Sequence, residues 1–185
     1  MTDEEEIATA RALQDRIEAA FLDVPYPGDE NISTCPEGGG PAQDYEEIAE
    51  AFIGKKWQDW KDSPLSLIGA PEIEQGALAF LDPGAFRYYL PLFLIAATRY
   101  YEQANLIPGN VVTAFMPGKE EGTRSLRDER FPLLTLEQFE TVKACLGFMK
   151  SAYGAEFLDD EIDLAIRNID REISRRAQGA SSSNP

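Results

Sequence analysis

The sequence contains no histidine, the residue that most often serves as a general base and as a metal ligand. This absence excludes Ser-His-Asp and Cys-His nucleophilic arrangements, together with zinc sites that need an imidazole ligand. The only two cysteines, Cys35 and Cys145, are far apart in the chain and do not form a metal-binding pair. They predict free thiols and a reducing compartment, and their spacing leaves open whether the two side chains approach each other.

Membrane spans, targeting signals and nucleotide-binding motifs are also missing. The longest apolar run, 11 residues between Arg87 and Arg99, falls short of the roughly 20 residues that cross a bilayer. The acidic N-terminus lacks the basic and apolar regions of a signal peptide, so we expect a cytoplasmic protein. The glycines at 38–40 lack the Gly-Lys-Ser/Thr of a phosphate loop, and the acids at 159–163 suit a first helical turn better than a calcium loop. We expect neither a cofactor nor a metal.

Negative charge is what the chain has in excess. Its 33 Asp and Glu residues outnumber 17 Lys and Arg residues, which gives a net charge of −16. Residues 1–60 hold 15 of the acids and 4 of the bases, a local net charge of −11. Such a field repels nucleic acid phosphates and anionic membranes, and it favours basic protein partners. Solubility alone would also explain an acidic surface.

Apolar residues recur at helical spacing, and no period-two strand pattern or Asn-Gly hairpin appears, so we predict a mainly α fold. The centre is a helix over about 82–103, in which Asp82 is the N-cap, Pro83 is the first helical residue and Pro91 introduces a kink. Because this helix is apolar on nearly all sides, the other helices should wrap around it in a bundle.

We expect one acidic helical domain over 1–177, a long loop over 24–43 and a disordered tail over 178–185. Capping boxes begin helices at Thr2 and at Thr135.

Two further helix starts follow from local residues, with Asp44 as an N-cap and another helix beginning near Pro71. From the latter, Ile73, Ala77, Leu78 and Leu81 should point inward.

The last predicted helix carries isoleucines repeating at intervals of 4, 3 and 4 residues. This narrow stripe either packs on the core of the same chain or forms a dimer seam. Its members are Ile162, Ile166, Ile169 and Ile173.

Five residues are candidates for a binding site. Trp57 and Trp60 either close the core, each with a partner for its indole N–H, or form an exposed aromatic anchor at an interface. Arg87, Tyr88 and Tyr89 on the central helix have the composition of an anion clamp. We favour the interpretation that Arg87 neutralises one of the many nearby acids.

The chain resembles a family of small bacterial proteins classed only as a domain of unknown function. The resemblance covers roughly residues 10–153 and depends mainly on a Gly-Lys-x-Trp element followed by an Ala-Phe-Arg-Tyr-Tyr-Leu-Pro helix. It implies one intact domain and a bacterial origin, and it brings no assigned activity, cofactor or catalytic residue. Four segments carry it in order: Ala19-Ala-Phe-x-x-Val-Pro-Tyr-Pro-Gly, Phe52-Ile-Gly-Lys-Lys-Trp, Leu81-Asp-Pro-Gly-Ala-Phe-Arg-Tyr-Tyr-Leu-Pro and Leu134-Thr-Leu-Glu-Gln.

Our first hypothesis is a non-enzymatic interaction protein that binds and neutralises a basic protein, in the manner of an immunity protein or antitoxin. The alternative is a small-molecule-binding domain or a histidine-free enzyme, with a pocket near Arg87, Tyr88 and Pro91. A third possibility is a DNA mimic, whose surface carboxylates would be spaced like phosphates.

Overall fold

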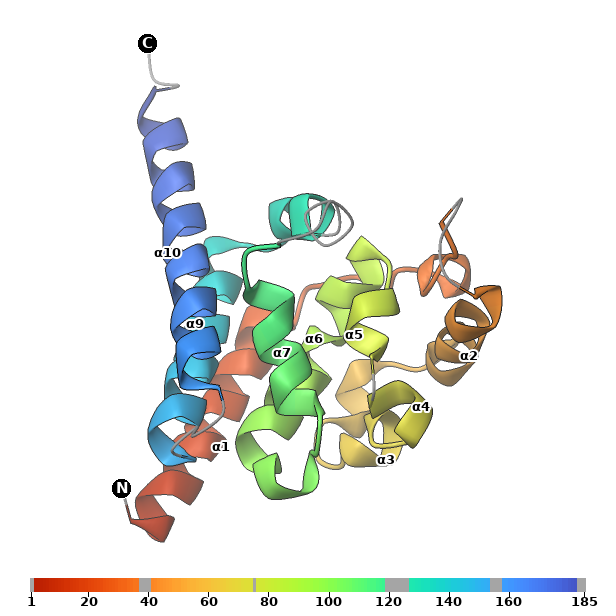
Figure 1. The fold of residues 1–185 in the computed structure, drawn as a ribbon, viewed down its shortest axis with the longest axis horizontal. Helices are drawn as coiled ribbons and strands as arrows, with labels where there is room; N and C mark the ends of the chain where they lie inside the picture. Colours follow the sequence, from red (N-terminus) through yellow and green to blue (C-terminus); the bar gives the residue numbers. More distant parts are fainter. Residues whose placement is uncertain (1, 37–40, 75, 119–126, 154–157, 183–185) are drawn as a thin grey trace.

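The computed structural model describes residues 2–36, 41–74, 76–118, 127–153 and 158–182, and these residues form helices and loops without a strand (Figure 1). The mainly α fold class is therefore confirmed. The principal helices are α1 (Asp3–Phe21), α2 (Ala42–Phe52), α3 (Leu65–Ile68), α4 (Pro71–Glu74), α5 (Ala77–Phe80), α6 (Pro83–Arg99), α7 (Ile107–Phe115), α9 (Leu136–Ala152) and α10 (Asp159–Ser182). Short 3₁₀ turns lie between them: η1 (Asp29–Asn31), η2 (Trp57–Trp60), η3 (Tyr101–Gln103) and η4 (Phe131–Leu133).

Helix α6 lies at the centre of the molecule, as its apolar sequence predicts. Every residue from Tyr88 to Thr98 is buried, and the helix contacts α1, α7 and α9 as well as several shorter elements. The predicted span of 82–103 comprises this helix, which ends at Arg99, and the 3₁₀ turn η3. Pro91 is buried inside the helix, and the kink expected there stays a prediction.

Asp82, which precedes the first turn of α6, forms hydrogen bonds with a loop that is distant in the sequence. Asp82 is the N-cap and Pro83 the first helical residue, but the Asp82 carboxylate does not cap the helix. It accepts hydrogen bonds from the N–H (3.1 Å) and the hydroxyl (2.6 Å) of Thr34, and the Asp82 N–H donates to the Ile32 carbonyl (2.9 Å). The prediction of Asp82 as the N-cap is confirmed, although its carboxylate pairs with a residue 48 positions away and not with the first turn of the helix.

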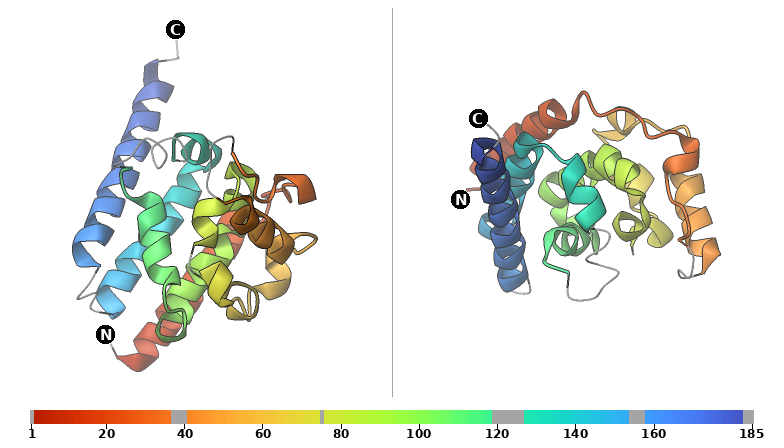
Figure 2. Two further views of the ribbon diagram at one scale, coloured as in Figure 1. Left: turned by 45° about the vertical axis from the view of Figure 1, so that its right-hand side comes forward. Right: turned by 90° about the horizontal axis from the view of Figure 1, so that it is seen from above.

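Helices α1, α9 and α10 form one side of the bundle (Figures 1 and 2). Helices α1 and α9 pack on α6 and on each other, and α10 covers α9 and α7. The capping boxes predicted at Thr2 and Thr135 are both confirmed, with Glu5 and Gln138 as their reciprocal partners.

The isoleucine stripe of α10 packs on the core of its own chain. Ile162 and Ile169 are fully buried, and Ile166 and Ile173 are partly buried against the same core. A dimer seam would need these side chains to be available, so the first of our two interpretations describes their packing. The oligomeric state stays untested.

Helix α10 extends into the segment for which we predicted a disordered tail, because it continues through Ser182. Residues 183–185 lie outside the described residues, and the disorder of the tail stays a prediction.

Helix α2 lies at the end of the molecule opposite α9 and α10 (Figures 1 and 2). It begins at Ala42 with Pro41 at the N-cap, so Asp44 lies in the first turn and the cap predicted for it is wrong. The loop before α2 contains η1, and the glycines at 38–40 lie outside the described residues.

The helix predicted to begin near Pro71 is two short helices, α4 and α5. The residues predicted to point inward from this segment are all buried: Ile73, Ala77, Leu78 and Leu81.

Neither cysteine forms a disulfide in the described structure, and Cys35 is partly exposed while Cys145 is buried in the core. Burial raises the pKa of the Cys145 thiol to about 12, so this side chain is protonated and unreactive at neutral pH. In the described part of the chain, no helix combines the length and the apolar character that crossing a bilayer requires.

Candidate functional site

The tryptophan pair lies against the core. Trp57 is 1% exposed, and Trp60 is partly buried with the Lys55 ammonium 5.9 Å from its ring centroid. This packing agrees with the first of our two interpretations, in which the two tryptophans close the core. The expected partner for each indole N–H is missing for Trp57, whose Nε1 has no hydrogen bond within the described structure.

The two tyrosines of the central helix meet the Gly-Lys-x-Trp element and the Val-Pro-Tyr-Pro-Gly segment in one cluster. The Tyr89 hydroxyl lies 2.9 Å from the Phe52 carbonyl and 2.8 Å from the Lys55 carbonyl. The ring of Tyr88 makes edge contacts with Tyr89 (4.9 Å between centroids) and with Tyr26 (5.4 Å). Three of the four segments that carry the family resemblance therefore join around Tyr89.

Tyr26 completes this cluster by binding the turn that follows α2. Its hydroxyl donates to the Asp29 carboxylate, and the Gly54 N–H lies 2.9 Å from that hydroxyl and 3.1 Å from Asp29 Oδ1. Gly54 has a φ of +70°, a left-handed conformation that favours glycine, so the turn depends on this residue type.

The tyrosines act here as neutral hydrogen-bond donors. Burial raises the pKa of Tyr89 far above its usual value, and burial also raises the pKa of Tyr88. For Tyr26, burial and the hydrogen bond to the Asp29 carboxylate both raise the pKa. A phenol with a raised pKa stays protonated at neutral pH, so none of these groups suits the role of a general base.

Arg87 does not neutralise an acid, contrary to our expectation. Its Nε donates to Gln138 Oε1 (3.0 Å), and no carboxylate of the described residues lies within ion-pairing distance. Partial burial without a carboxylate lowers the pKa of the Arg87 guanidinium. Gln138 also donates to the Ala20 carbonyl (2.9 Å), so Arg87 helps to join α6, α9 and α1.

The exposed acids of α2 form a second candidate site, which we call the acidic α2 surface. Within the described part of residues 2–60, Glu18 is the only acid in an ion pair, with Lys61 at 2.5 Å. The side chains of α2 that carry negative charge are all exposed and lack such a partner. They are Asp44, Glu46, Glu47 and Glu50.

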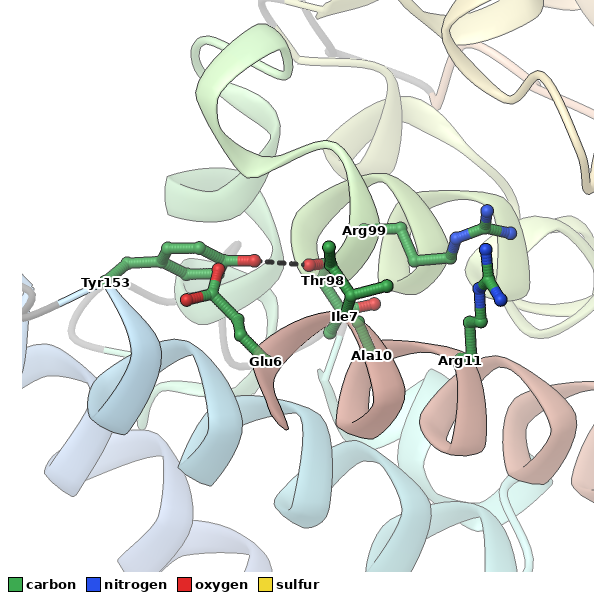
Figure 3. A pocket seen from close by; sticks show the side chains of 7 residues that line it. All are labelled: Glu6, Ile7, Ala10, Arg11, Thr98, Arg99 and Tyr153. Atoms are coloured by element: carbon green, nitrogen blue, oxygen red, sulfur yellow. Dashed lines mark hydrogen bonds between the residues drawn. The ribbon is translucent and has the colours of Figure 1, made fainter. Parts of the chain in front are cut away.

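A pocket of about 190 Å³ opens between α1 and the C-terminal end of α6 (Figure 3). It contains two arginines, Arg11 from α1 and Arg99 from the last turn of α6. Sequence reasoning missed this site because the two residues are 88 positions apart and no spacing rule connects them. The remaining lining residues are Glu6, Ile7, Ala10, Thr98 and Tyr153.

Among the described residues, no three Cys, Asp or Glu side chains are grouped closely enough to hold a metal ion. The tyrosine cluster, the acidic α2 surface and the pocket between α1 and α6 each offer only a few kinds of chemical group. The tyrosine cluster has phenols and carbonyls, the acidic α2 surface has carboxylates without ion pairs in the described structure, and the pocket has two guanidinium groups.

Comparisons with known proteins identify the family of this chain. No curated protein and no solved structure matches the chain. The model of one family of unknown function, DUF6714, matches residues 9–168, which include α2, the tyrosine cluster and most of the helical bundle. Because this match spans far more than half of the 185 residues, the chain belongs to the family of unknown function DUF6714.

Proposed function

We propose that the protein is a non-enzymatic interaction domain that binds a basic protein through the acidic α2 surface. The observation that carries the proposal is the concentration of exposed, unpaired acids on one short helix. A basic partner would be attracted over long range by such a surface and would be held in register by matching charges.

The cost of these charges to the free protein supports the proposal. Glu46 and Glu50 are four residues apart on α2, and Asp44 and Glu47 are three apart, so like charges are neighbours on the helix surface. Each such pair destabilises a helix by about 0.2–0.5 kcal/mol. Lysines or arginines of a partner would convert this repulsion into attraction.

The way α2 is attached also supports the proposal, because the helix presents its acids on a firm base. Ile48 and Phe52 are buried, Tyr45 packs on Phe80 of α5 with 4.9 Å between ring centroids, and Phe52 packs on Tyr89. Ile53, at the end of α2, is 43% exposed and adds apolar contact area beside the acids. A polar rim around an apolar centre is typical of protein interfaces.

The alternative function, a pocket near Arg87, Tyr88 and Pro91, has no specific observation in its favour. Tyr88 is 3% exposed, Pro91 is buried, and the Arg87 Nε–H is used by Gln138. A ligand would have to displace these contacts.

The test is a pull-down from the native host, followed by titration of the purified partner at about 50 mM and about 300 mM salt. The test variant neutralises the acidic α2 surface by Asp44→Asn, Glu46→Gln, Glu47→Gln and Glu50→Gln. We expect a basic partner to bind the wild type at low salt, to dissociate at higher salt and to be lost with the variant.

A matched control carries the same change in net charge at exposed acids elsewhere in the chain, and it should bind like the wild type. Binding that is unchanged at high salt, equal loss in both variants, or no captured protein at low salt would each contradict the proposal. The control substitutions are Asp62→Asn, Glu102→Gln, Glu137→Gln and Asp160→Asn.

A further inference from the structure

The pocket between α1 and α6 brings two arginines to one end of a small cavity. Figure 3 shows the guanidinium groups of Arg11 and Arg99 at the same end, while Tyr153 and Glu6 lie at the other. Ile7 and Ala10, one turn apart on α1, provide the apolar wall between the two ends. The pocket is therefore polar at both ends and apolar in the middle.

Arg99 is held in place by neutral and aromatic groups. Its guanidinium donates to Gln14 Oε1 and lies 5.4 Å from the ring centroid of Tyr100. The Gln14 amide nitrogen in turn donates to Glu18 (2.9 Å), which orients the Gln14 oxygen toward Arg99. One N–H group of the guanidinium is thus satisfied by a neutral amide, and its other N–H groups have no hydrogen-bond partner among the described residues.

Arg11 has no hydrogen-bond or ion-pair partner among the described residues. Asp15 is four residues later on α1, a spacing that commonly gives an ion pair, yet the two side chains are not paired. Figure 3 shows the Arg11 side chain directed toward the end of the pocket where Arg99 lies. The chain thus places a second cation beside the first, although its acids outnumber its bases by 33 to 17.

Two neighbouring guanidinium groups repel each other, and an anion between them replaces that repulsion with two favourable contacts. Guanidinium groups bind carboxylate and phosphate oxygens through paired hydrogen bonds, because their N–H groups match the spacing of those oxygens. We propose that this pocket binds a small molecule that carries a carboxylate or phosphate group between Arg11 and Arg99.

The size and the far end of the pocket restrict the ligand further. An apolar cavity of about 150 Å³ holds a benzene molecule, so a pocket of about 190 Å³ has room for a group of that size. The Tyr153 hydroxyl donates to the Thr98 carbonyl (2.6 Å), and its ring stacks on Tyr101 at 4.1 Å, which fixes that wall. Glu6 faces Tyr153, so a second anionic group at that end of the ligand would be repelled.

The proposal is independent of the acidic α2 surface, which lies on a different helix, so either proposal can fail alone. The test uses the full chain labelled with ¹⁵N, and it follows backbone amide chemical shifts during titration with propionate, methyl phosphate or chloride at constant ionic strength. We expect saturable shifts at Ala10, Arg11, Thr98 and Arg99 with one or both of the first two probes, and none with chloride.

Two variants on the same helix make the test specific. Arg11→Gln should weaken binding of the probe by about tenfold or more, which corresponds to about 1.4 kcal/mol. Arg11 is exposed and without a partner in the described structure, so this variant should fold normally. Arg16→Gln removes another exposed arginine of α1 that does not line the pocket, and it should bind like the wild type.

Each result has a definite meaning. Saturation with propionate alone identifies a carboxylate ligand, and saturation with methyl phosphate alone identifies a phosphate ligand. The proposal is overturned if neither probe shifts these amides more than chloride does. It is also overturned if Arg11→Gln and Arg16→Gln weaken binding equally, because the probe would then be responding to general surface charge.

Discussion

Charged residues are paired at one end of the molecule and lack ion pairs in the described structure at the other. At the α9–α10 end, Lys143 pairs with Asp170 at 3.0 Å, Lys150 pairs with Asp163 at 2.7 Å, and further pairs lie within each helix. At the α2 end, the acids are exposed and, in the described structure, without ion pairs, and apolar and aromatic contacts hold the helix to the core.

The difference indicates which charges contribute to folding. Charges that join α9 to α10 connect two helices and are partly shielded from water, so they add modestly to stability. Charges on α2 make no ion pair in the described structure, where the Gln43 amide donates to Glu47 within the helix, and they repel one another. Under our proposal, these charges serve the binding of an external partner and not the stability of the fold. Three predictions test this comparison.

The largest effect is expected when the apolar attachment of α2 is removed. Phe52→Ala should lower the free energy of unfolding by about 3–5 kcal/mol, because the side chain is fully buried and packs on Tyr89. Chemical denaturation of the purified protein measures this change. Ile53→Ala, at the exposed neighbouring position, should change stability by less than about 0.5 kcal/mol. Similar values for the two variants would show that α2 is not anchored through Phe52.

A smaller, pH-dependent effect is expected at the opposite end. Hydrogen bonds from Arg175 and Arg176 hold the pKa of the Glu172 carboxyl below its usual value, despite partial burial. A lowered carboxyl pKa contributes stability that is present above the usual pKa and is lost as the pH falls through the lowered value. Glu172→Gln should therefore cost about 1 kcal/mol at neutral pH, and this cost should shrink as the pH is lowered from neutral through the acidic range.

Thermal unfolding of the wild type and Glu172→Gln across this pH range provides the measurement. Asp160→Asn is the control, because Asp160 is an exposed acid of the same helix without an ion pair in the described structure. If the difference between wild type and Glu172→Gln did not shrink on acidification, the ion pairs with Arg175 and Arg176 would not be the source of the stabilisation.

The smallest effect is expected when the acidic α2 surface is neutralised by the four substitutions named above. Removal of neighbouring like charges should raise the free energy of unfolding by a few tenths of a kcal/mol, since no ion pair is lost. Urea denaturation at low salt would reveal it, and added salt should reduce it. A loss of more than about 1 kcal/mol would mean that these acids stabilise the fold, which would remove the reason for assigning them to a partner.

Sequence reasoning succeeded where local pattern decides the outcome. The apolar residues of the central helix demand cover on all sides, and the pairs Thr2 with Glu5 and Thr135 with Gln138 form capping boxes because the partners are three residues apart. Sequence reasoning failed where a side chain has possible partners both nearby and far away in the chain. Asp82 binds Thr34 instead of its own helix, and Arg87 binds Gln138 instead of a carboxylate.

The sequence alone therefore determined the helical class, the central position of residues 83–99, the family and the acidic character of the N-terminal third. These properties follow from composition and from spacings of three or four residues, which a linear chain displays directly. Only the tertiary structure decided that Tyr26, Gly54 and Tyr89 meet in one cluster, and that Arg11 lies near Arg99. Contacts of this kind depend on how whole helices pack, because packing sets the distance between residues that are dozens of positions apart in the sequence.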